Sequence, residues 1–195
     1  MRRNIAIDKL KLLKTVFDKS EQGSMTPGNS TSLTDGAAAV LLSSEEWAHN
    51  NNLRIEAYLT HCEIAAIDYI NDEGLLMAPA YAVSSMLRKA NLTLQDFDFY
   101  EIHEAFAAQT LATLKAWESI DFCRSKLNRD IVMGSIDSSK LNIKGGSLAI
   151  GHPFAATGAR IIATMAKLLN EKGSGRGLIS ICTAGGMGIT AIMEK

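Results

Sequence analysis

The sequence GGSLAIGHPFAATGAR, residues 145–160, decides the fold of this chain. It joins a Gly-Gly turn, a short apolar run, the tripeptide Gly151-His152-Pro153 and the start of a helical pattern. Glycine permits tight turns, and Pro153 suits the first turn of a helix, where its missing N–H costs no hydrogen bond. We therefore predict that His152 lies where a strand passes into a helix, as a candidate general base.

The rest of the chain alternates helical patterns with short β-rich runs. Apolar residues at i, i+1, i+4, i+7 and i+8 predict a helix over 155–169. A glycine-rich turn at 183–188 separates two β-branched runs, 178–182 and 189–194, and predicts an antiparallel pair. Further helices are predicted at 5–17, 79–91 and 104–117 and after the N-cap pattern 43–46. Strands are predicted at 53–66, 97–102 and 131–133, and loops over 20–36 and much of 121–142. The apolar run 37–42 is predicted to be a buried strand or helix. This order predicts an α/β fold, a mixed sheet with helices on its faces.

Composition narrows the class of protein. The chain has 195 residues, 47% of them hydrophobic, and a formal net charge of −1, so no strong attraction to nucleic acid or an anionic membrane is expected. Its longest apolar runs fall well short of the roughly 18–20 residues of a membrane span, and its basic start lacks the apolar core of a signal peptide. Three irregularly spaced cysteines predict neither a disulfide framework nor a metal site, and favour a reducing, cytoplasmic compartment.

Three residues with chemical potential stand at the expected ends of strands. His103 follows the β-rich run 97–102, Cys182 ends the run 178–182, and His152 lies in the opening stretch. Singly, a cysteine is usually a small buried hydrophobe, and a histidine is often a capping or core residue. Together at strand ends, where α/β proteins build their sites, they predict acid–base or nucleophilic chemistry.

Three motifs carry a family resemblance. Residues 145–160, HEAFAAQ (103–109) and CTAGGMG (182–188) resemble motifs of the C-terminal half of a thiolase. The likeness runs from about residue 20 to the end, is nearest to the 3-ketoacyl-CoA thiolases of fatty-acid oxidation multienzyme complexes, and includes PGNSTSLTDGAAAVLL (27–42). It implies one thiolase C-terminal domain over 1–195, with a mixed five-stranded sheet between helices on both faces.

The resemblance also implies residue roles. His152 matches the histidine that activates the nucleophilic cysteine and helps to form an oxyanion hole. Cys182 matches the second cysteine, which moves a proton to and from the α-carbon of the acetyl unit and the sulfur of coenzyme A. His103 stands where most thiolases have Asn, and would donate directly to the thioester oxygen. The substrate-binding positions that the family implies are Ala184, Gly185, Thr31, Ala105 and Phe106.

Ala184 departs from the glycine that many relatives have. Because only its backbone N–H would serve the oxyanion hole, alanine suffices if its φ is negative. The implied reaction is thiolytic cleavage of a 3-ketoacyl-CoA to acetyl-CoA and a shortened acyl-CoA. Coenzyme A is then a co-substrate, and neither a permanent cofactor nor a metal is expected.

The nucleophilic cysteine of the family's first half has no counterpart here. Cys62 lies in a strand-like run without a glycine elbow, and Cys123 lies in a polar stretch, so we expect both to be structural. The chain is then inactive alone, because covalent catalysis needs the missing thiol. We expect its partners to be a second copy or a complementary thiolase half, and the hydratase/dehydrogenase subunit of a β-oxidation complex.

Other interpretations stay open at this point. One is a non-catalytic acyl-CoA-binding or subunit-assembly module derived from a thiolase. Another is an α/β domain whose helix N-termini bind a different phosphate compound, in which Cys182 has no purpose. The related ketoacyl synthases share the fold but have His or Asn where this chain has Cys182, which favours a thiolase.

Overall fold

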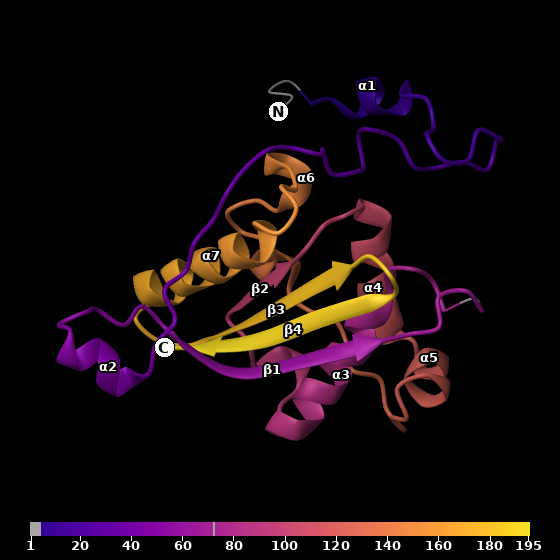
Figure 1. The fold of residues 1–195 in the computed structure, drawn as a ribbon. Helices are drawn as coiled ribbons and strands as arrows, with labels where there is room; N and C mark the ends of the chain where they lie inside the picture. Colours follow the sequence, from indigo (N-terminus) through magenta and orange to yellow (C-terminus); the bar gives the residue numbers. More distant parts are fainter. Residues whose placement is uncertain (1–4, 72) are drawn as a thin grey trace.

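A mixed four-stranded sheet organises the computed structural model, which describes residues 5–71 and 73–195 (Figure 1). The strand order is β1-β4-β3-β2, with β4 antiparallel to both of its neighbours and β2 parallel to β3. The bounds are β1 Tyr58–Ala66, β2 Phe99–Ile102, β3 Arg176–Thr183 and β4 Met187–Glu194. The α/β mixed sheet is thus confirmed, but with four strands among the described residues; beyond β2 a bridge from Tyr100 to Leu141 extends it.

Helices cover both faces of the sheet, as the resemblance implied (Figure 1). Helices α3 and α4 pack on one face and α7 packs on the other. The α-helices are α1 Ile7–Lys11, α2 Glu45–Asn50, α3 Ala78–Ala90, α4 Ala107–Glu118, α5 Ile120–Ser125, α6 Ser147–Ile150 and α7 Thr157–Lys172, with 3₁₀ turns at Leu94–Asp96 and Ser138–Lys140. No described helix is both long and apolar enough to cross a membrane.

The two cores follow the alternation of side chains along the central strands. Leu178 of β3 packs in the core under α3 and α4, around the fully buried Trp117. Its neighbour Ile179 packs in the core under α7, with Ile161 and Met165. Successive residues of a strand point to opposite faces, so a strand buried on both sides is apolar throughout. This explains why residues 178–182 form a nearly continuous apolar run.

Most predicted elements are confirmed with shifted bounds. Helices α3, α4 and α7 and strands β2, β3 and β4 lie where the patterns place them. Ser44 caps α2, accepting a hydrogen bond from the Trp47 N–H at 3.2 Å. Gly173, at φ 85°, ends α7, because glycine readily adopts this left-handed conformation. Strand β1 begins only at Tyr58, and the helix expected over 5–17 shortens to α1.

Two predicted elements are wrong. Residues 131–133 form no strand, and the expected loop around them begins with helix α5. Residues 37–42 are neither helix nor strand, and all except the half-buried Val40 are exposed: Leu41 is 71% and Leu42 63% exposed. An apolar run becomes a strand only when a neighbouring strand accepts its hydrogen bonds, and among the described residues none pairs with it.

The setting of His152 also differs from the prediction. The apolar run before it forms the short helix α6 rather than a strand, and Gly151, at φ 98°, ends that helix. Pro153 does not begin α7; it heads a turn in which the Ala156 N–H donates to the Pro153 carbonyl at 3.1 Å. His152 therefore lies in a tight loop between two helices, and its surroundings are set by turn geometry rather than by a strand.

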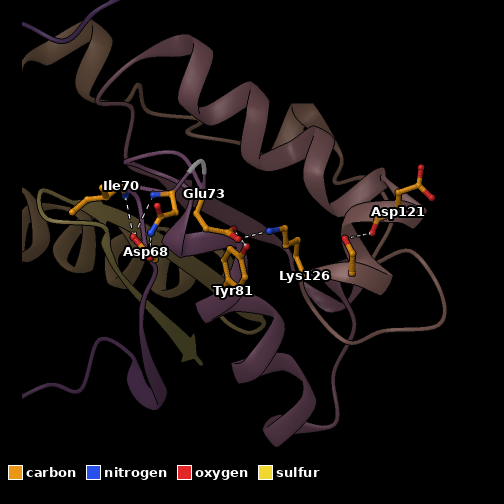
Figure 2. A network of polar contacts seen from close by, with 8 residues as sticks. Asp68, Ile70, Glu73, Tyr81, Asp121 and Lys126 are labelled. Atoms are coloured by element: carbon orange, nitrogen blue, oxygen red, sulfur yellow. Dashed lines mark hydrogen bonds and ion pairs between the residues drawn. The ribbon is translucent and has the colours of Figure 1, made fainter.

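The loop that follows β1 is fastened to the α3 side of the sheet by a polar network (Figure 2). The carboxylate of Glu73 accepts hydrogen bonds from the Tyr81 hydroxyl of α3 and the Lys126 ammonium. Earlier in the loop, the Asp68 carboxylate accepts from the Ile70 N–H at 3.2 Å. The Ile67 N–H donates to the Gly186 carbonyl at 2.9 Å, so the same loop also supports the turn between β3 and β4.

Candidate active site

Two histidines face each other at one end of the sheet. His103 directly follows β2, and its N–H donates to the Ser180 carbonyl of β3 at 2.8 Å. His152 is held in its loop because its N–H donates to the Ser32 carbonyl at 3.0 Å. The two imidazole centroids lie 4.2 Å apart with planes tilted by 47°. The structure thus brings together the histidines of two motifs that are far apart in sequence.

A hydroxyl group holds each imidazole. Thr157 Oγ1 lies 2.6 Å from His152 Nδ1, and the Thr157 hydroxyl donates to the Pro153 carbonyl at 3.4 Å. It therefore accepts from Nδ1–H, which leaves Nε2 of His152 with a free lone pair. Ser147 Oγ lies 2.8 Å from His103 Nδ1 in a buried contact, and if it donates there, the proton of His103 is left on Nε2. The Thr157 contact therefore indicates the tautomer of His152, whereas the Ser147 hydroxyl can serve either tautomer of His103.

Burial keeps both histidines neutral. His103 is 1% exposed, and desolvation lowers its pKa to about 4, with the nearby charges of His152 and Arg160 acting in the same direction. The pKa of His152 is also lowered, by burial first and then by Arg160. Neutral imidazoles are what a base at His152 and a hydrogen-bond donor at His103 both require.

A buried carboxyl group lies behind the pair on β2. Glu101 is 1% exposed, and desolvation raises its pKa to about 7, against the opposing charge of Arg160. Its Oε1 and the Nε of Arg160 are buried and have no hydrogen-bond partner among the described residues. Glu101 therefore carries less negative charge at neutral pH than an exposed glutamate does.

Cys182 lies at the same edge of the sheet, near the end of β3. Because β2 and β3 are parallel, their carboxyl ends meet there, which places Cys182 on the strand beside His103. Cys182 is 5% exposed, and its thiol donates to Oε1 of Gln109 at 3.5 Å. Burial raises the pKa of this thiol to about 11, while the N–H groups of Cys182 and Ala105 act in the opposite direction. The sulfur is therefore a protonated acid in the resting protein.

The turn between β3 and β4 contains the implied oxyanion donor. Thr183 pairs with Met187, so Ala184, Gly185 and Gly186 form the three-residue connection. Ala184 is not among the residues with positive φ, whereas Gly185 (82°) and Gly186 (70°) are. The condition under which alanine is acceptable at residue 184 is met, because the left-handed positions fall on the glycines.

Residues 29–34 cross over both histidine motifs. The Thr31 N–H donates to the Ala105 carbonyl at 3.0 Å, and its hydroxyl donates to the Ser147 carbonyl at 2.8 Å. Ser30 bridges to Phe106 next to the same contact. Thr31, Ala105 and Phe106 are thus adjacent in space and half-buried. Their contact with an acyl-CoA remains a prediction, and the Thr31 hydroxyl already has a partner within the protein.

Sequence reasoning missed the residues that support the site. The Asn142 amide accepts from the Ile102 N–H at 2.9 Å and donates to Oε1 of Glu104 at 2.7 Å. Glu104 Oε2 in turn accepts from the Leu148 N–H of α6 at 3.1 Å. This chain of bonds joins the end of β2 to the helix that presents Ser147. The sequence did offer a hint for Glu104, because it directly follows His103. Its partners Asn142 and Leu148 are distant in the sequence and become adjacent only in the fold.

The two other cysteines lie outside the site. Cys62 is exposed on β1, paired with Ala191 of β4. Cys123 is fully buried in α5, where its thiol donates to the Trp117 carbonyl at 3.5 Å. Across residues 5–71 and 73–195, no three His, Cys, Asp or Glu residues gather as a metal site would need. A thiol nucleophile for the histidine pair is therefore not supplied by either cysteine.

Two histidines with lowered pKa and a buried thiol at a sheet's carboxyl edge form a site with the groups that acid–base chemistry needs. Comparison with known families agrees: residues 53–195 match the family model for the thiolase C-terminal domain, and residues 1–46 match the model for the thiolase N-terminal domain. The chain belongs to the thiolase family.

Individual relatives are 3-ketoacyl-CoA thiolases and other thiolases. The 3-ketoacyl-CoA thiolase of Shewanella loihica is 45% identical over 100% of this chain, which covers 44% of that protein. The dimeric peroxisomal thiolase of Saccharomyces cerevisiae superposes with a TM-score of 0.82 at 34% identity, over 100% of this chain and 44% of that one. Human mitochondrial 3-ketoacyl-CoA thiolase in complex with CoA gives a TM-score of 0.75 at 31% identity, with the same coverage. The chain thus spans less than half the length of these relatives.

Proposed function

We propose that residues 1–195 act as one domain that supplies the acid–base half of a 3-ketoacyl-CoA thiolase site. The observation that supports this most is the histidine pair, His103 and His152, each held at Nδ1 by a hydroxyl group, beside the buried thiol of Cys182. The reaction is thiolysis of a 3-ketoacyl-CoA by coenzyme A, which yields acetyl-CoA and an acyl-CoA shortened by two carbons. Coenzyme A is a co-substrate, and its presence in the human relative supports this class of ligand.

His152 is the general base. Its free Nε2 lone pair takes the proton from a cysteine thiol of the complementary half, and the sulfur then attacks the keto carbon of the substrate. The Thr157 hydroxyl supports the positive ring that results, because it keeps accepting from Nδ1–H. A base with a pKa below its ordinary value is already unprotonated at neutral pH.

His103 and the Ala184 N–H are the oxyanion donors. In this proposal the Ser147 hydroxyl donates to Nδ1 of His103, so that the ring presents Nε2–H, and burial prevents this ring from becoming a cation. Charge that develops on the thioester oxygen is stabilised by such fixed dipoles, which need no reorganisation during the reaction. Histidine can reach that oxygen directly, as expected for the multienzyme-complex branch.

Cys182 moves the second proton. When the bond between the α- and β-carbons breaks, the acetyl-CoA unit leaves as an enolate, and the Cys182 thiol gives its proton to the α-carbon. The S–H electron pair stays on sulfur, and the thiolate then takes the proton of the incoming coenzyme A thiol. A thiol pKa of about 11 suits an acid toward an enolate, which is a much stronger base.

The complementary half provides the nucleophile in this proposal. The second copy or partner half covers the exposed apolar segment 37–42, and the assembly joins a hydratase/dehydrogenase subunit of β-oxidation in the cytoplasm. The extent of exposed apolar surface, with Leu33 at 78%, Leu41 at 71% and Leu42 at 63%, supports an obligatory partner.

The test is thiolysis of a medium-chain 3-ketoacyl-CoA, followed through loss of the enolate absorbance when coenzyme A is added. We expect no turnover from the chain alone, and turnover when it is mixed with the polypeptide that precedes the matched region in the Shewanella loihica relative. Cys182→Ser and His152→Ala should abolish that turnover, whereas Cys62→Ser should not. Turnover by the chain alone would contradict the proposal of a missing nucleophile.

A second candidate is a non-catalytic acyl-CoA-binding or assembly module. The observation that favours it is the placement of Cys62 and Cys123 away from the histidine pair. Calorimetry with an acyl-CoA separates the two functions. The module would be favoured if the chain binds an acyl-CoA equally well with and without His152→Ala, and if the mixture with the complementary half shows no turnover.

A further inference from the structure

The side-chain amide of Gln109 touches the Cys182 sulfur from helix α4. Gln109 stands in the first turn of α4, is 8% exposed, and accepts the thiol proton with Oε1 at 3.5 Å. The buried thiol of Cys123 instead donates to a backbone carbonyl, which can only accept. Cys182 therefore has a partner whose other end is a hydrogen-bond donor.

The end of the Gln109 amide that points away from the sulfur contacts a hydroxyl group, which can pair with either the oxygen or the nitrogen of the amide. Nε2 of Gln109 lies 3.5 Å from Oγ1 of Thr113, one helical turn later, and Thr113 is fully buried. A hydroxyl both donates and accepts. A half-turn of the amide would exchange Oε1 and Nε2 at the sulfur and still leave Thr113 with a suitable partner. The same side chain can thus accept from a thiol or donate to a thiolate.

The site offers a thiolate little other help. Burial opposes ionisation of Cys182, and the groups that favour it are the backbone N–H of Cys182 and of Ala105. Of the titratable side chains in the site, His103 and His152 are kept neutral by their lowered pKa. The charges of Glu104 and Arg160 act on Glu101 and the histidines, and no charged side chain is among the causes of the pKa shift of Cys182. Helix α4 and strand β4 bring no charged side chain against the thiol among its described contacts. A thiolate here must be stabilised by dipoles rather than by a cation.

We propose that Gln109 is a positioning residue whose side-chain amide reverses its orientation when Cys182 changes its protonation state. In the resting protein its carbonyl accepts from the thiol; after the thiol has given its proton to the enolate α-carbon, the amide N–H groups donate to the thiolate. The catalytic purpose of this rotation rests on the proposed proton transfer by Cys182. The rotation itself depends only on ionisation of the Cys182 thiol. Neither a carboxylate nor an apolar side chain at this position could both accept from the thiol and donate to the thiolate.

The experiment measures ionisation of Cys182 without substrate. The purified chain is alkylated with iodoacetamide across a pH series, and the peptide that contains Cys182 is quantified by mass spectrometry. Gln109→Leu should slow alkylation of Cys182 about five- to tenfold at pH 9, because the thiolate loses its donor. If the amide only accepts from the thiol, the same change destabilises the thiol and alkylation becomes faster.

Two further variants separate this role from packing. Thr113→Val keeps shape and removes the second support of the amide, so we expect a smaller slowing, about two- to threefold. Gln109→Glu offers an acceptor without a donor and should slow alkylation more than Gln109→Leu. The matched control is Gln95→Leu, which removes an amide bound to loop carbonyls and should leave the Cys182 profile unchanged.

An unchanged or faster alkylation rate in Gln109→Leu or in Thr113→Val, with a native circular dichroism spectrum, overturns the proposal. If Gln109→Leu does not fold, the rate in Thr113→Val decides by the same criterion. Absence of thiolysis in the complemented mixture would refute the proposed function, yet leave a measured shift in thiol ionisation standing, so the two failures are distinguishable.

Discussion

The imidazoles of His103 and His152 lie 4.2 Å apart between centroids, and a different hydroxyl group contacts Nδ1 of each ring. The Thr157 hydroxyl accepts from Nδ1–H of His152, and we propose that the Ser147 hydroxyl donates to Nδ1 of His103. Two adjacent histidines would normally compete for protons through charge repulsion. Here burial keeps both neutral, and the proposed hydrogen bonds to the two hydroxyl groups leave Nε2 of His152 as an acceptor and Nε2–H of His103 as a donor.

The positive charge of Arg160 acts on both rings. It lowers the pKa of His103 and of His152, so Arg160→Met should raise both. Proton NMR titration of the imidazole C–H signals, assigned by single histidine substitutions, measures the change. The control is Lys167→Met, which removes an exposed positive charge from the same helix. Equal His152 pKa values in the wild type and in Arg160→Met would contradict this electrostatic account.

The hydroxyl group of Thr157 holds His152, and its removal should be measurable. Thr157→Val keeps the side-chain shape and should destabilise the fold by about 1 kcal/mol, because the Nδ1–H loses its buried acceptor. Thr157→Ser restores an oxygen and should recover most of that loss. Urea unfolding followed by circular dichroism measures both. In the complemented thiolysis assay the valine variant should also lose more kcat than the serine variant.

Two buried groups, His103 and Glu101, should affect stability with opposite signs as the pH changes. His103 has a folded pKa of about 4 against an ordinary value of 6.5, so the unfolded chain binds more protons and stability rises with pH between these values. Glu101 has a folded pKa of about 7 against 4.5, so the folded chain binds more protons and stability falls with rising pH across that window. The two trends nearly cancel between about pH 5 and pH 6.5.

Single substitutions should therefore reveal each trend. Glu101→Gln removes the falling contribution, and the free energy of unfolding should then rise by about 2 kcal/mol from about pH 5 to pH 6.5. His103→Asn should produce a fall of similar size over the same range. Urea unfolding at several pH values measures both slopes. Parallel pH profiles for the wild type and both variants would contradict the assigned pKa shifts.

Backbone strain beside His152 is concentrated at Ala155. Its φ is 65°, a left-handed conformation that costs a residue with a Cβ about 1 kcal/mol or more. Ala155→Gly should stabilise the protein by about 0.5 kcal/mol, since part of the gain is lost to the greater freedom of the unfolded chain. Gly151→Ala is the opposite case, because its φ is 98° and a Cβ would lie 2.6 Å from the Thr34 side chain. Thermal melts should shift in opposite directions.

Much of the fold follows from the sequence because most of its elements bury a continuous face. Helix α7 and strands β3 and β4 lie where their apolar patterns predict them, and sequence motifs pointed to Cys182 and the two histidines as candidate site residues. The errors have a common cause: the contacts that decide those segments are not local. Residues 37–42 have an apolar strand-like composition without a neighbouring strand, and residues 147–150 are helical where Glu104 caps the Leu148 N–H. Likewise, Ser147 and Gln109 become site residues only through contacts across the fold.

The exposed segment 37–42 should promote self-association. An extended apolar run with free backbone groups is a template for pairing with another chain, so the protein should associate as its concentration rises. The surface beside it is also apolar: a groove of about 660 Å³ lies between residues 39–45, residues 53–59 and one side of α7, with Ile162 and Ala166 in its wall.

Sedimentation velocity over about a hundredfold range of concentration measures this association. Leu41→Lys and Leu42→Lys should weaken it at least about tenfold, because burying an ammonium group in a dry interface costs more than one hydrogen bond returns. Ile131→Lys is the matched control, since Ile131 is 72% exposed and does not line the groove. A monomer at all concentrations would contradict the prediction. Equal weakening by all three variants would place the contact elsewhere, since of the three residues only Leu41 and Leu42 line the groove.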